Sequence, residues 1–321
     1  MSSVALVLPY WGRFPGYFQF FLESVRRNPA IDVHVFTDSK CDFAWPDNAH
    51  IHLMPFRQFK ANMQEHYDFQ LEHLQNPYNL CDFKPTYGYC LQEYLQGYDF
   101  WGHCDCDLIF GDFRSFFTDE LLSKYDRFLT RGHLTLYRNN EGTNKSFMEI
   151  CPEEKNYKRV FQSSSKLVWA WDEYGGLSLY WKEKLKDRLY DEIIFDDLNA
   201  DRKHFIANQR YDDDCMNGKT NLCYLYKDGA LNRVSVRNGD SLVIEPTLYA
   251  HFQKRRLFNK CNTGDYNKYL IVPNSIIDYE DITVAKVKMW GRRRLFYFSS
   301  LKRRSGNLLR KVKRWFNPVV G

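Results

Sequence analysis

Residues 98–112 read YDFWGHCDCDLIFGD and carry two aspartates, Asp105 and Asp107, around which the rest of the sequence can be arranged. The aromatic residues before them and the apolar run after them predict a buried β-strand that ends in acidic residues. Residues two apart in an extended segment project to the same face, so both carboxylates can approach one cation while Cys104 and Cys106 face the other way. Carboxylate oxygens suit Mg²⁺ and Mn²⁺. The stretch therefore predicts a divalent metal site, although two solvated acids in a loop are the alternative.

The hundred residues before this stretch alternate between strand and helix patterns. Short apolar runs predict strands at 4–9, 31–36 and 50–54, and helical spacing of apolar residues predicts helices at 17–25 and 57–75. A strand, a helix and a second strand in succession predict a parallel sheet, and ligands bind such sheets at the carboxyl ends of their strands. The sequence thus predicts an α/β fold with a mixed, mostly parallel central sheet flanked by helices.

Another helix leads into the acidic stretch, beginning at Lys84-Pro85 and ending at Gly97. Beyond the stretch the pattern is less regular. Residues 131–138 predict one more strand, residues 139–165 are polar and predict loop, and residues 167–176 form an aromatic and acidic turn.

The basic residues are concentrated at the C-terminal end. Twelve Lys and Arg and no Asp or Glu follow residue 285, which leaves 33 basic against 40 acidic residues in 1–285. Residues 286–321 interleave these cations with aromatic and aliphatic residues, a composition typical of an amphipathic helix on an anionic membrane. The alternatives are a basic tail that binds nucleic acid and a solvated helix that packs on the domain. We expect this segment to bind an anionic membrane surface and expect no nucleic-acid partner.

The remaining composition favours a cytoplasmic protein. The nine cysteines show neither a zinc-binding spacing nor a disulfide framework, and the N-terminus lacks the basic region and the long apolar run of a signal peptide. No stretch has the length of a membrane-spanning helix.

The acidic stretch resembles the D-x-D strand of GT-A-fold glycosyltransferases, and the chain is similar to bacterial enzymes of capsule and lipopolysaccharide O-antigen synthesis. The likeness extends over residues 1–285 and includes the blocks LPYWGRFP at 8–15, FTD at 36–38, Lys84-Pro85 and HFQKR at 251–255. It implies a UDP-sugar donor, such as UDP-galactose, and a Mn²⁺ or Mg²⁺ ion. It also implies a glycan or lipid-linked glycan acceptor and a place on the inner face of the plasma membrane. Residues 1–130 would form the donor-binding half and residues 131–285 the acceptor half.

The resemblance also implies roles for residues at the strand ends. Pro9-Tyr10 and Thr37-Asp38 would hold the nucleobase and ribose, although Asp38 is equally suited to closing a turn. Lys84 would reach Asp105 or a phosphate, unless it is a surface lysine. Asp105 and Asp107 would bind the metal, and Asp105 would also contact the donor.

Late in the chain, the resemblance assigns His251 to the metal, and Lys254 and Arg255 to the diphosphate. Most histidines are structural or exposed, so this ligand assignment needs the neighbouring cations to support it.

The turn at 167–176 resembles the acceptor-side loop of some inverting enzymes, in which a carboxylate deprotonates the acceptor hydroxyl. Asp172 or Glu173 is the candidate base, and Trp171 would stack on a sugar. Helix-capping acids beside core tryptophans are the alternative. His133 and the cluster Asp212–Asp214 are weaker candidates for the base.

Two other classes of protein stay open. A phosphatase of the haloacid-dehalogenase type would use Asp105 and Asp107 as its D-x-D, with Asp196-Asp197 as its later acidic pair, but such enzymes normally begin with that strand. A non-catalytic, membrane-bound scaffold would keep the sugar-nucleotide fold without turnover. The sequence leaves the donor sugar, the acceptor and the stereochemical course undetermined.

Overall fold

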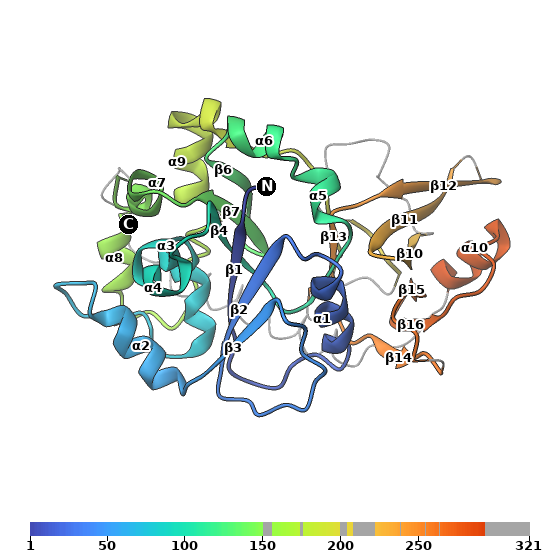
Figure 1. Ribbon diagram of the computed structural model, residues 1–321, viewed down its shortest axis with the longest axis horizontal. Coiled ribbons are helices and arrows are strands. Elements are labelled where there is room, and N and C mark those ends of the chain that lie inside the picture. The colour runs from blue at the N-terminus through green and yellow to red at the C-terminus, as the bar shows by residue number, and fades with distance from the viewer. Residues whose placement is uncertain are drawn as a thin grey trace, which may run out of the picture.

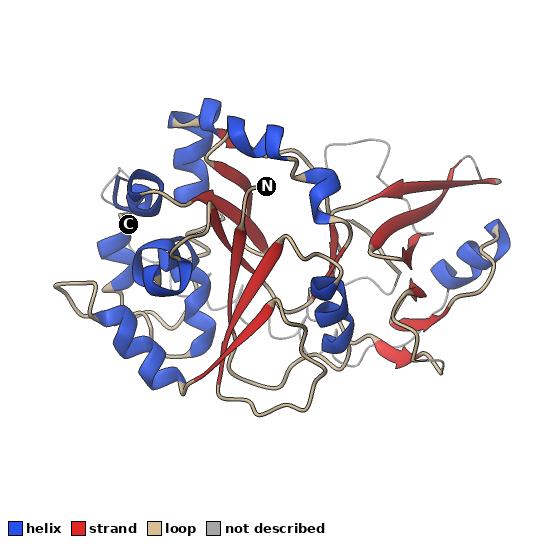
Figure 2. Ribbon diagram, viewed as in Figure 1, coloured by secondary structure: helices blue, strands red, loops and turns tan. Residues whose placement is uncertain are grey.

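The computed structural model describes residues 1–149, 156–173, 176–199, 204–207, 222–237, 239–253, 255–262 and 264–292. A large sheet flanked by helices forms one part of the molecule, and a smaller sheet that carries α10 (Val284–Arg292) forms the other (Figures 1 and 2). The predicted α/β class with a mostly parallel central sheet is confirmed.

The central sheet has the strand order β3-β2-β1-β4-β7-β6-β8. Its strands are β1 (Val4–Pro9), β2 (Ile31–Thr37), β3 (Ala49–Leu53), β4 (Phe100–Cys104), β6 (Arg127–Arg131), β7 (Leu134–Arg138) and β8 (Leu189–Tyr190). β7 runs antiparallel to both of its neighbours, and all other pairs are parallel. The strands β1, β2 and β4 therefore end at one edge of the sheet.

Helices cover both faces because successive residues of a strand point to opposite sides. In β1, Leu6 packs in the core that contains α1, whereas Val7 packs in the core formed with α2, η1 and α9. The helices are α1 (Phe18–Arg26), α2 (Phe56–Gln64), η1 (Pro77–Thr86), α3 (Tyr87–Cys90), α4 (Gln92–Leu95), α5 (Phe113–Phe116), α6 (Asp119–Lys124), α7 (Glu141–Lys145), η2 (Ser146–Glu149), α8 (Tyr157–Phe161), α9 (Leu177–Lys184) and η4 (Lys186–Arg188).

Two smaller sheets complete the fold. A three-stranded sheet joins β5 (Leu108–Phe110), β13 (Tyr249–His251) and β9 (Asp196–Asp197). A six-stranded sheet has the order β12-β11-β10-β15-β16-β14. Its strands are β10 (Leu222–Lys227), β11 (Ala230–Arg237), β12 (Ser241–Pro246), β14 (Phe258–Lys260), β15 (Lys268–Val272) and β16 (Ser275–Asp278).

The basic C-terminal segment begins inside α10. Val287 and Trp290 of this helix are buried against β10, β11 and β15. The first residues of the predicted tail thus pack on the domain, and the tail from residue 293 lies outside the described residues. Within the described ranges, every helix is too short or too polar to span a bilayer.

Several predicted elements differ from the structure. The helix expected at 57–75 ends at Gln64, whose side chain then holds the following turn through Leu71 N and Phe69 O. The helix expected from Lys84 is a 3₁₀ segment followed by two single turns, and Pro85 inside it has no backbone donor. Where the polar residues 139–165 are described, at 139–149 and 156–165, they contain the short helical segments α7, η2 and α8 rather than loop alone.

The strand expected at 131–138 is confirmed over Leu134–Arg138, but its first residues differ, because the chain reverses at Gly132-His133 and forms the hairpin β6–β7. The turn is held by bonds from Lys84 and Glu173 to the Gly132 backbone, which are invisible in the local sequence.

Candidate functional site

The carboxyl ends of β1, β2 and β4 bring three of the predicted segments to one edge of the sheet. Val7 is paired with His103, so Pro9-Tyr10 lie at the end of the strand next to β4, and β4 ends just before Asp105. Pro9 is paired with Phe36 on the other side of β1, so Thr37-Asp38 lie one strand further along the same edge. Thr37 is buried and Asp38 is exposed. Burial, with Cys106 and Asp107 nearby, raises the pKa of the Tyr10 phenol to about 12, so this ring borders the acidic stretch.

The acidic stretch itself is a turn between β4 and β5, not a continuous extended strand. The Asp105 backbone N donates to the His133 carbonyl at 3.0 Å, and the Phe252 backbone N donates to the Asp107 carbonyl at 2.9 Å. Both side chains still lie on the same side of the chain, and Cys106 points into the core, as the alternation predicted.

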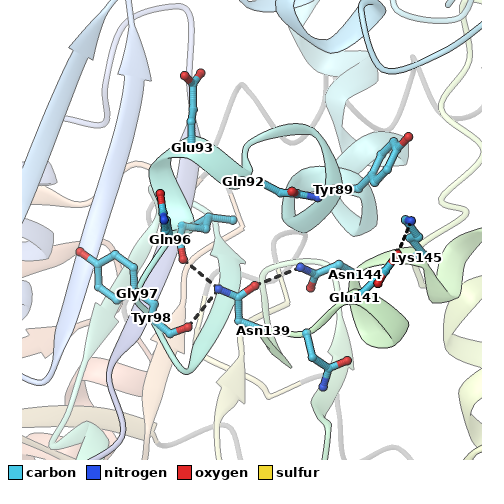
Figure 3. Close-up of a pocket in the computed structure, with 12 residues that line it drawn as sticks. Tyr89, Gln92, Glu93, Gln96, Gly97, Tyr98, Asn139, Glu141, Asn144 and Lys145 are labelled. Carbon is cyan, nitrogen blue, oxygen red and sulfur yellow. Dashed lines mark hydrogen bonds and ion pairs between the residues drawn. The ribbon is translucent and has the colours of Figure 1, made fainter.

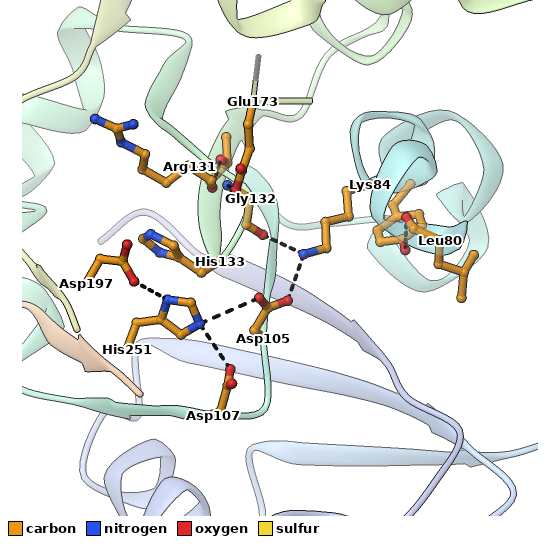
Figure 4. A network of polar contacts seen from close by, with 12 residues as sticks. Leu80, Lys84, Asp105, Asp107, Arg131, Gly132, His133, Glu173, Asp197 and His251 are labelled. Atoms are coloured by element: carbon orange, nitrogen blue, oxygen red, sulfur yellow. Dashed lines mark hydrogen bonds and ion pairs between the residues drawn. The ribbon is translucent and has the colours of Figure 1, made fainter. Parts of the chain in front are cut away.

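His251 faces both aspartates from β13 (Figure 4). The antiparallel pairing of β13 with β5 places His251 opposite Leu108, next to the end of the acidic turn. Its Nε2 lies 3.3 Å from Asp107 Oδ1 and 4.0 Å from Asp105 Oδ2. One ligand atom from each of the three residues falls within 4.8 Å of the others. The structure therefore brings together the three residues that the sequence assigned to a metal.

The other nitrogen of His251 is held by Asp197, which the sequence placed with Asp105 and Asp107 only in the phosphatase alternative. His251 Nδ1 lies 2.7 Å from Asp197 Oδ1, and the Gln253 amide donates to both oxygens of that carboxylate at 2.6 and 2.7 Å. Burial lowers the pKa of His251, but Asp107 and Asp197 outweigh it and raise the pKa to about 10. The imidazole is thus fixed in orientation and lies in a strongly negative environment.

Lys84 ties this cluster to a second group of carboxylates. Its buried ammonium donates to Asp105 Oδ1 at 2.7 Å and to the Gly132 carbonyl at 2.6 Å. Burial lowers the pKa of this ammonium, but Asp105, Cys81 and Asp172 together outweigh it, so the pKa lies well above its ordinary value. Lys84 is a charged partner of Asp105 and not a surface lysine.

Asp172 and Glu173 meet on the other side of Gly132. Glu173 Oε1 accepts from the Gly132 backbone N at 2.7 Å. A Cβ on Gly132 would lie 2.5 Å from this oxygen and 2.9 Å from Asp172 Oδ2. Burial raises the pKa of Asp172 to about 8, although Lys84 opposes the shift. Asp172 therefore keeps its proton to a much higher pH than an ordinary aspartate does.

The loop that carries these two acids is anchored by a buried pair that the sequence analysis missed. Asp82 accepts from the backbone N of Trp169 at 2.9 Å and of Trp171 at 3.0 Å, and from His73 Nε2 at 2.7 Å. His73 Nδ1 reaches the Ser165 carbonyl at 3.0 Å. Both members of the pair are fully buried, so the turn at 167–173 is held firmly on η1.

The two tryptophans of this loop take opposite positions. Trp171 is 3% exposed and packs in the core with Phe161, whereas Trp169 is 43% exposed. Between them, Ala170 adopts a left-handed conformation with φ of 51°. The expectation that Trp171 stacks on a sugar is therefore wrong, because its ring fills the core, and Trp169 is the ring that faces solvent.

The remaining predicted residues lie elsewhere. Lys254 and Asp212–Asp214 fall outside the described residues. Arg255 is buried, and its guanidinium donates to the carbonyls of Asn199 and His204 and stacks 5.2 Å from the Phe205 ring. These contacts give Arg255 a structural role in this conformation of the chain.

A surface hollow of about 700 Å³ lies at the opposite end of β4 (Figure 3). It is lined by residues of α4, by Tyr98 and by residues of α7. The Asn144 amide donates to Asn139 Oδ1, and the Asn139 amide donates to the backbone carbonyls of Leu95 and Tyr98, so these two side chains join α7 to the segment before β4. The hollow is separate from the cluster around Asp105.

These features define an α/β protein with a carboxylate and imidazole cluster at the carboxyl edge of its sheet. The chain belongs to a family of unknown function, DUF6625, which matches residues 6–280. No curated protein matches the sequence.

Two solved structures have a similar arrangement of the chain. One is the galactosyltransferase LgtC in complex with donor and acceptor sugar analogs, with 10% identity, a TM-score of 0.38, and coverage of 78% of this chain and 87% of that one. The other is the glycosyltransferase GlyE of Streptococcus pneumoniae, with 10% identity, a TM-score of 0.31, and coverage of 60% of this chain and 45% of that one. At these values neither structure assigns a substrate to this chain.

Proposed function

We propose that this protein is a metal-dependent glycosyltransferase that takes a sugar from a nucleotide-sugar donor, with Asp105, Asp107 and His251 at its centre. The observation that carries the proposal is the convergence of these three side chains within 4.8 Å at the carboxyl edge of an α/β sheet. Strand ends of this kind are where open α/β sheets bind their ligands. The D-x-D resemblance supplies the chemical class.

The donor set fits a hard divalent cation. Two carboxylates and one imidazole suit Mn²⁺ or Mg²⁺. The bond of His251 Nδ1 to Asp197 leaves Nε2 directed at the aspartates, which is the outer contact that metal-binding histidines commonly have. A bound ion would neutralise charge that develops on a diphosphate leaving group.

The residues of the site would have separate roles in binding the metal and the donor. Asp105, Asp107 and His251 would hold the ion, while Lys84 fixes one oxygen of Asp105 and leaves the other toward His251. Pro9-Tyr10 and Thr37-Asp38 border the same edge, where a nucleoside would lie.

On the acceptor side, Asp172 or Glu173 would take the proton of the attacking hydroxyl if the reaction inverts. The raised pKa of Asp172 suits a base that becomes active as the pH approaches 8. Glu173 Oε1 accepts a hydrogen bond from Gly132 N, so if Glu173 is the base, its Oε2 would take the proton.

The decisive experiment is a screen of nucleotide sugars, UDP-galactose included, for release of the nucleotide with Mn²⁺, with Mg²⁺ and with EDTA. We expect metal-dependent release from one donor, and loss of at least about a hundredfold in kcat in Asp107→Asn. Asp112→Asn is the matched control, because Asp112 caps α5 and asparagine caps as well.

Other outcomes point to the rival classes. Unchanged turnover in Asp107→Asn under saturating metal and donor would refute the metal role. Hydrolysis of phosphomonoesters without nucleotide-sugar turnover would favour the phosphatase, and binding of a nucleotide sugar without turnover would favour the scaffold.

We also propose that the basic C-terminal segment holds the protein on the inner face of the plasma membrane, near a lipid-linked acceptor of bacterial surface polysaccharide synthesis. Nine of its twelve Lys and Arg follow Arg292, beyond the helix that packs on the domain. Truncation after Arg292 should therefore release the protein from anionic liposomes without unfolding it. Equal binding of the truncated and full-length proteins would reject the anchor.

A further inference from the structure

His251 stands between two groups of possible metal ligands, only one of which the proposed function uses. Its Nε2 faces Asp105 and Asp107, and its Nδ1 faces Asp197. On this second side lies His133, whose ring centroid is 4.5 Å from that of His251. One ligand atom from each of His133, Asp197 and His251 falls within 4.8 Å of the others (Figure 4).

The two groups have different ligand chemistry. The first offers two carboxylates and one imidazole, which favour Mn²⁺ or Mg²⁺. The second offers two imidazoles and one carboxylate, the set that open zinc sites use, and a nitrogen-rich site favours Zn²⁺ over Mn²⁺.

Neighbouring side chains hold two members of the second group in place, as the outer contacts of metal ligands commonly do. The Tyr249 hydroxyl lies 2.8 Å from His133 Nδ1 and fixes the orientation of that ring. Gln253 donates to both oxygens of Asp197 and fixes its plane. His133 and His251 are 5% and 8% exposed, so neither ring has much freedom to turn away.

We propose that His133, Asp197 and His251 form a second metal site, selective for borderline divalent ions such as Zn²⁺, whose occupation withdraws His251 from the first. A neutral imidazole has one lone pair for a metal, so His251 serves one ion at a time. The second site thus makes Zn²⁺ an antagonist of the ion that the proposed function requires. The antagonism rests on the proposed function, but the binding of Zn²⁺ does not.

The test measures binding of each metal directly, in the full-length protein. Mn²⁺ binding is followed by the loss of the free-ion EPR signal, and Zn²⁺ binding by competition with a chromophoric chelator. Three variants separate the sites. His133→Gln should weaken Zn²⁺ binding more than about tenfold and leave Mn²⁺ binding unchanged. Asp107→Asn should do the reverse, and His251→Ala should weaken both.

The result that overturns the proposal is Zn²⁺ binding that survives His133→Gln but is lost in Asp107→Asn, because Zn²⁺ would then simply occupy the first site. Equal Zn²⁺ affinity in all three variants would overturn it as well. Thermal melts of each variant without metal check folding, and Tyr249→Phe provides a milder change that should weaken Zn²⁺ binding alone. Should no nucleotide sugar be turned over, the proposed function fails while the pattern of Zn²⁺ affinities still decides this site.

Discussion

Replacing Gly132 with alanine would test whether one turn couples the two groups of the site. Gly132 is bonded on both sides, through its carbonyl to Lys84 at 2.6 Å and through its N–H to Glu173 at 2.7 Å. A Cβ at this position would meet Glu173 Oε1 at 2.5 Å and Asp172 Oδ2 at 2.9 Å. The two acids must therefore move, or the turn must.

The size of the effect follows from these contacts. Relieving such an overlap costs about 1–3 kcal/mol of stability. The hydrogen bond from Gly132 N to the Glu173 carboxylate contributes a similar amount, and we expect it to be weakened but not lost. We expect Gly132→Ala to lower the free energy of unfolding by about 2 kcal/mol and Tm by roughly 3 °C, given the entropy of unfolding of a chain of 321 residues. If the proposed function holds, kcat should fall more than donor KM rises, since the shifted groups lie on the acceptor side.

The assay is urea unfolding, followed by kinetics at saturating donor. Gly142→Ala in α7 is the control, because its Cβ would meet only Asn140 Oδ1, at 3.6 Å, and alanine favours a helix. Stability and kcat of Gly132→Ala equal to those of this control would refute the coupling.

Three further changes test the parts of the site separately. His73→Ala removes one of the hydrogen bonds to the buried Asp82 carboxylate and should cost about 1.5–3 kcal/mol in urea unfolding, whereas His50→Ala, in a half-exposed pair, should cost under about 1 kcal/mol. The pKa of Asp172 is raised to about 8 in the folded protein from an ordinary value near 4, so the folded state holds an extra proton between these values and wild-type stability falls as the pH rises through this range. Asp172→Asn should therefore gain stability relative to wild type between pH 5 and pH 8.5, and a constant difference would contradict the buried, protonated acid. Trp171→Ala should cost about 3–5 kcal/mol and Trp169→Ala little, by the same urea assay, because only the first ring lies in the core.

The first half of the fold was predictable because its signals are local. The apolar run at β1, the amphipathic α1 and the apolar run at β2 lie within 34 residues, from Val4 to Thr37, and each has the period of its own element. The acidic turn could be placed for the same reason. Its detailed conformation could not, because it depends on a bond from Asp105 N to His133 that crosses to another hairpin.

The six-stranded sheet had a signal that the sequence analysis did not use. Asp228-Gly229 joins β10 to β11, and both residues have positive φ, of 50° and 90°. An Asp-Gly pair between two apolar, alternating runs is a strong hairpin signal. By contrast, nothing local marks Asp82 as the anchor of the loop at 167–173, since its partners are backbone groups nearly ninety positions away.

The arrangement around His251 depends on the register of the three-stranded sheet. β13 pairs His251 with Leu108 on one side and with Asp197 on the other, while Ala250 pairs with Asp196. Side chains alternate along a strand, so Tyr249, His251 and Asp197 share one face, whereas Asp196 points away and binds Arg233 at 2.8 Å.

A slip of one residue would exchange these faces and put Ala250 where His251 now meets Asp107. Each of the three strands is only two or three residues long, so the sheet itself provides little to resist the slip. The buried pair of Asp196 with Arg233, which joins this sheet to β11, resists it instead: a slip would leave the Arg233 charge buried without this carboxylate. The two adjacent acids thus have different roles. Asp196 fixes the register of the three-stranded sheet through Arg233, and Asp197 orients His251, which this register places opposite Leu108.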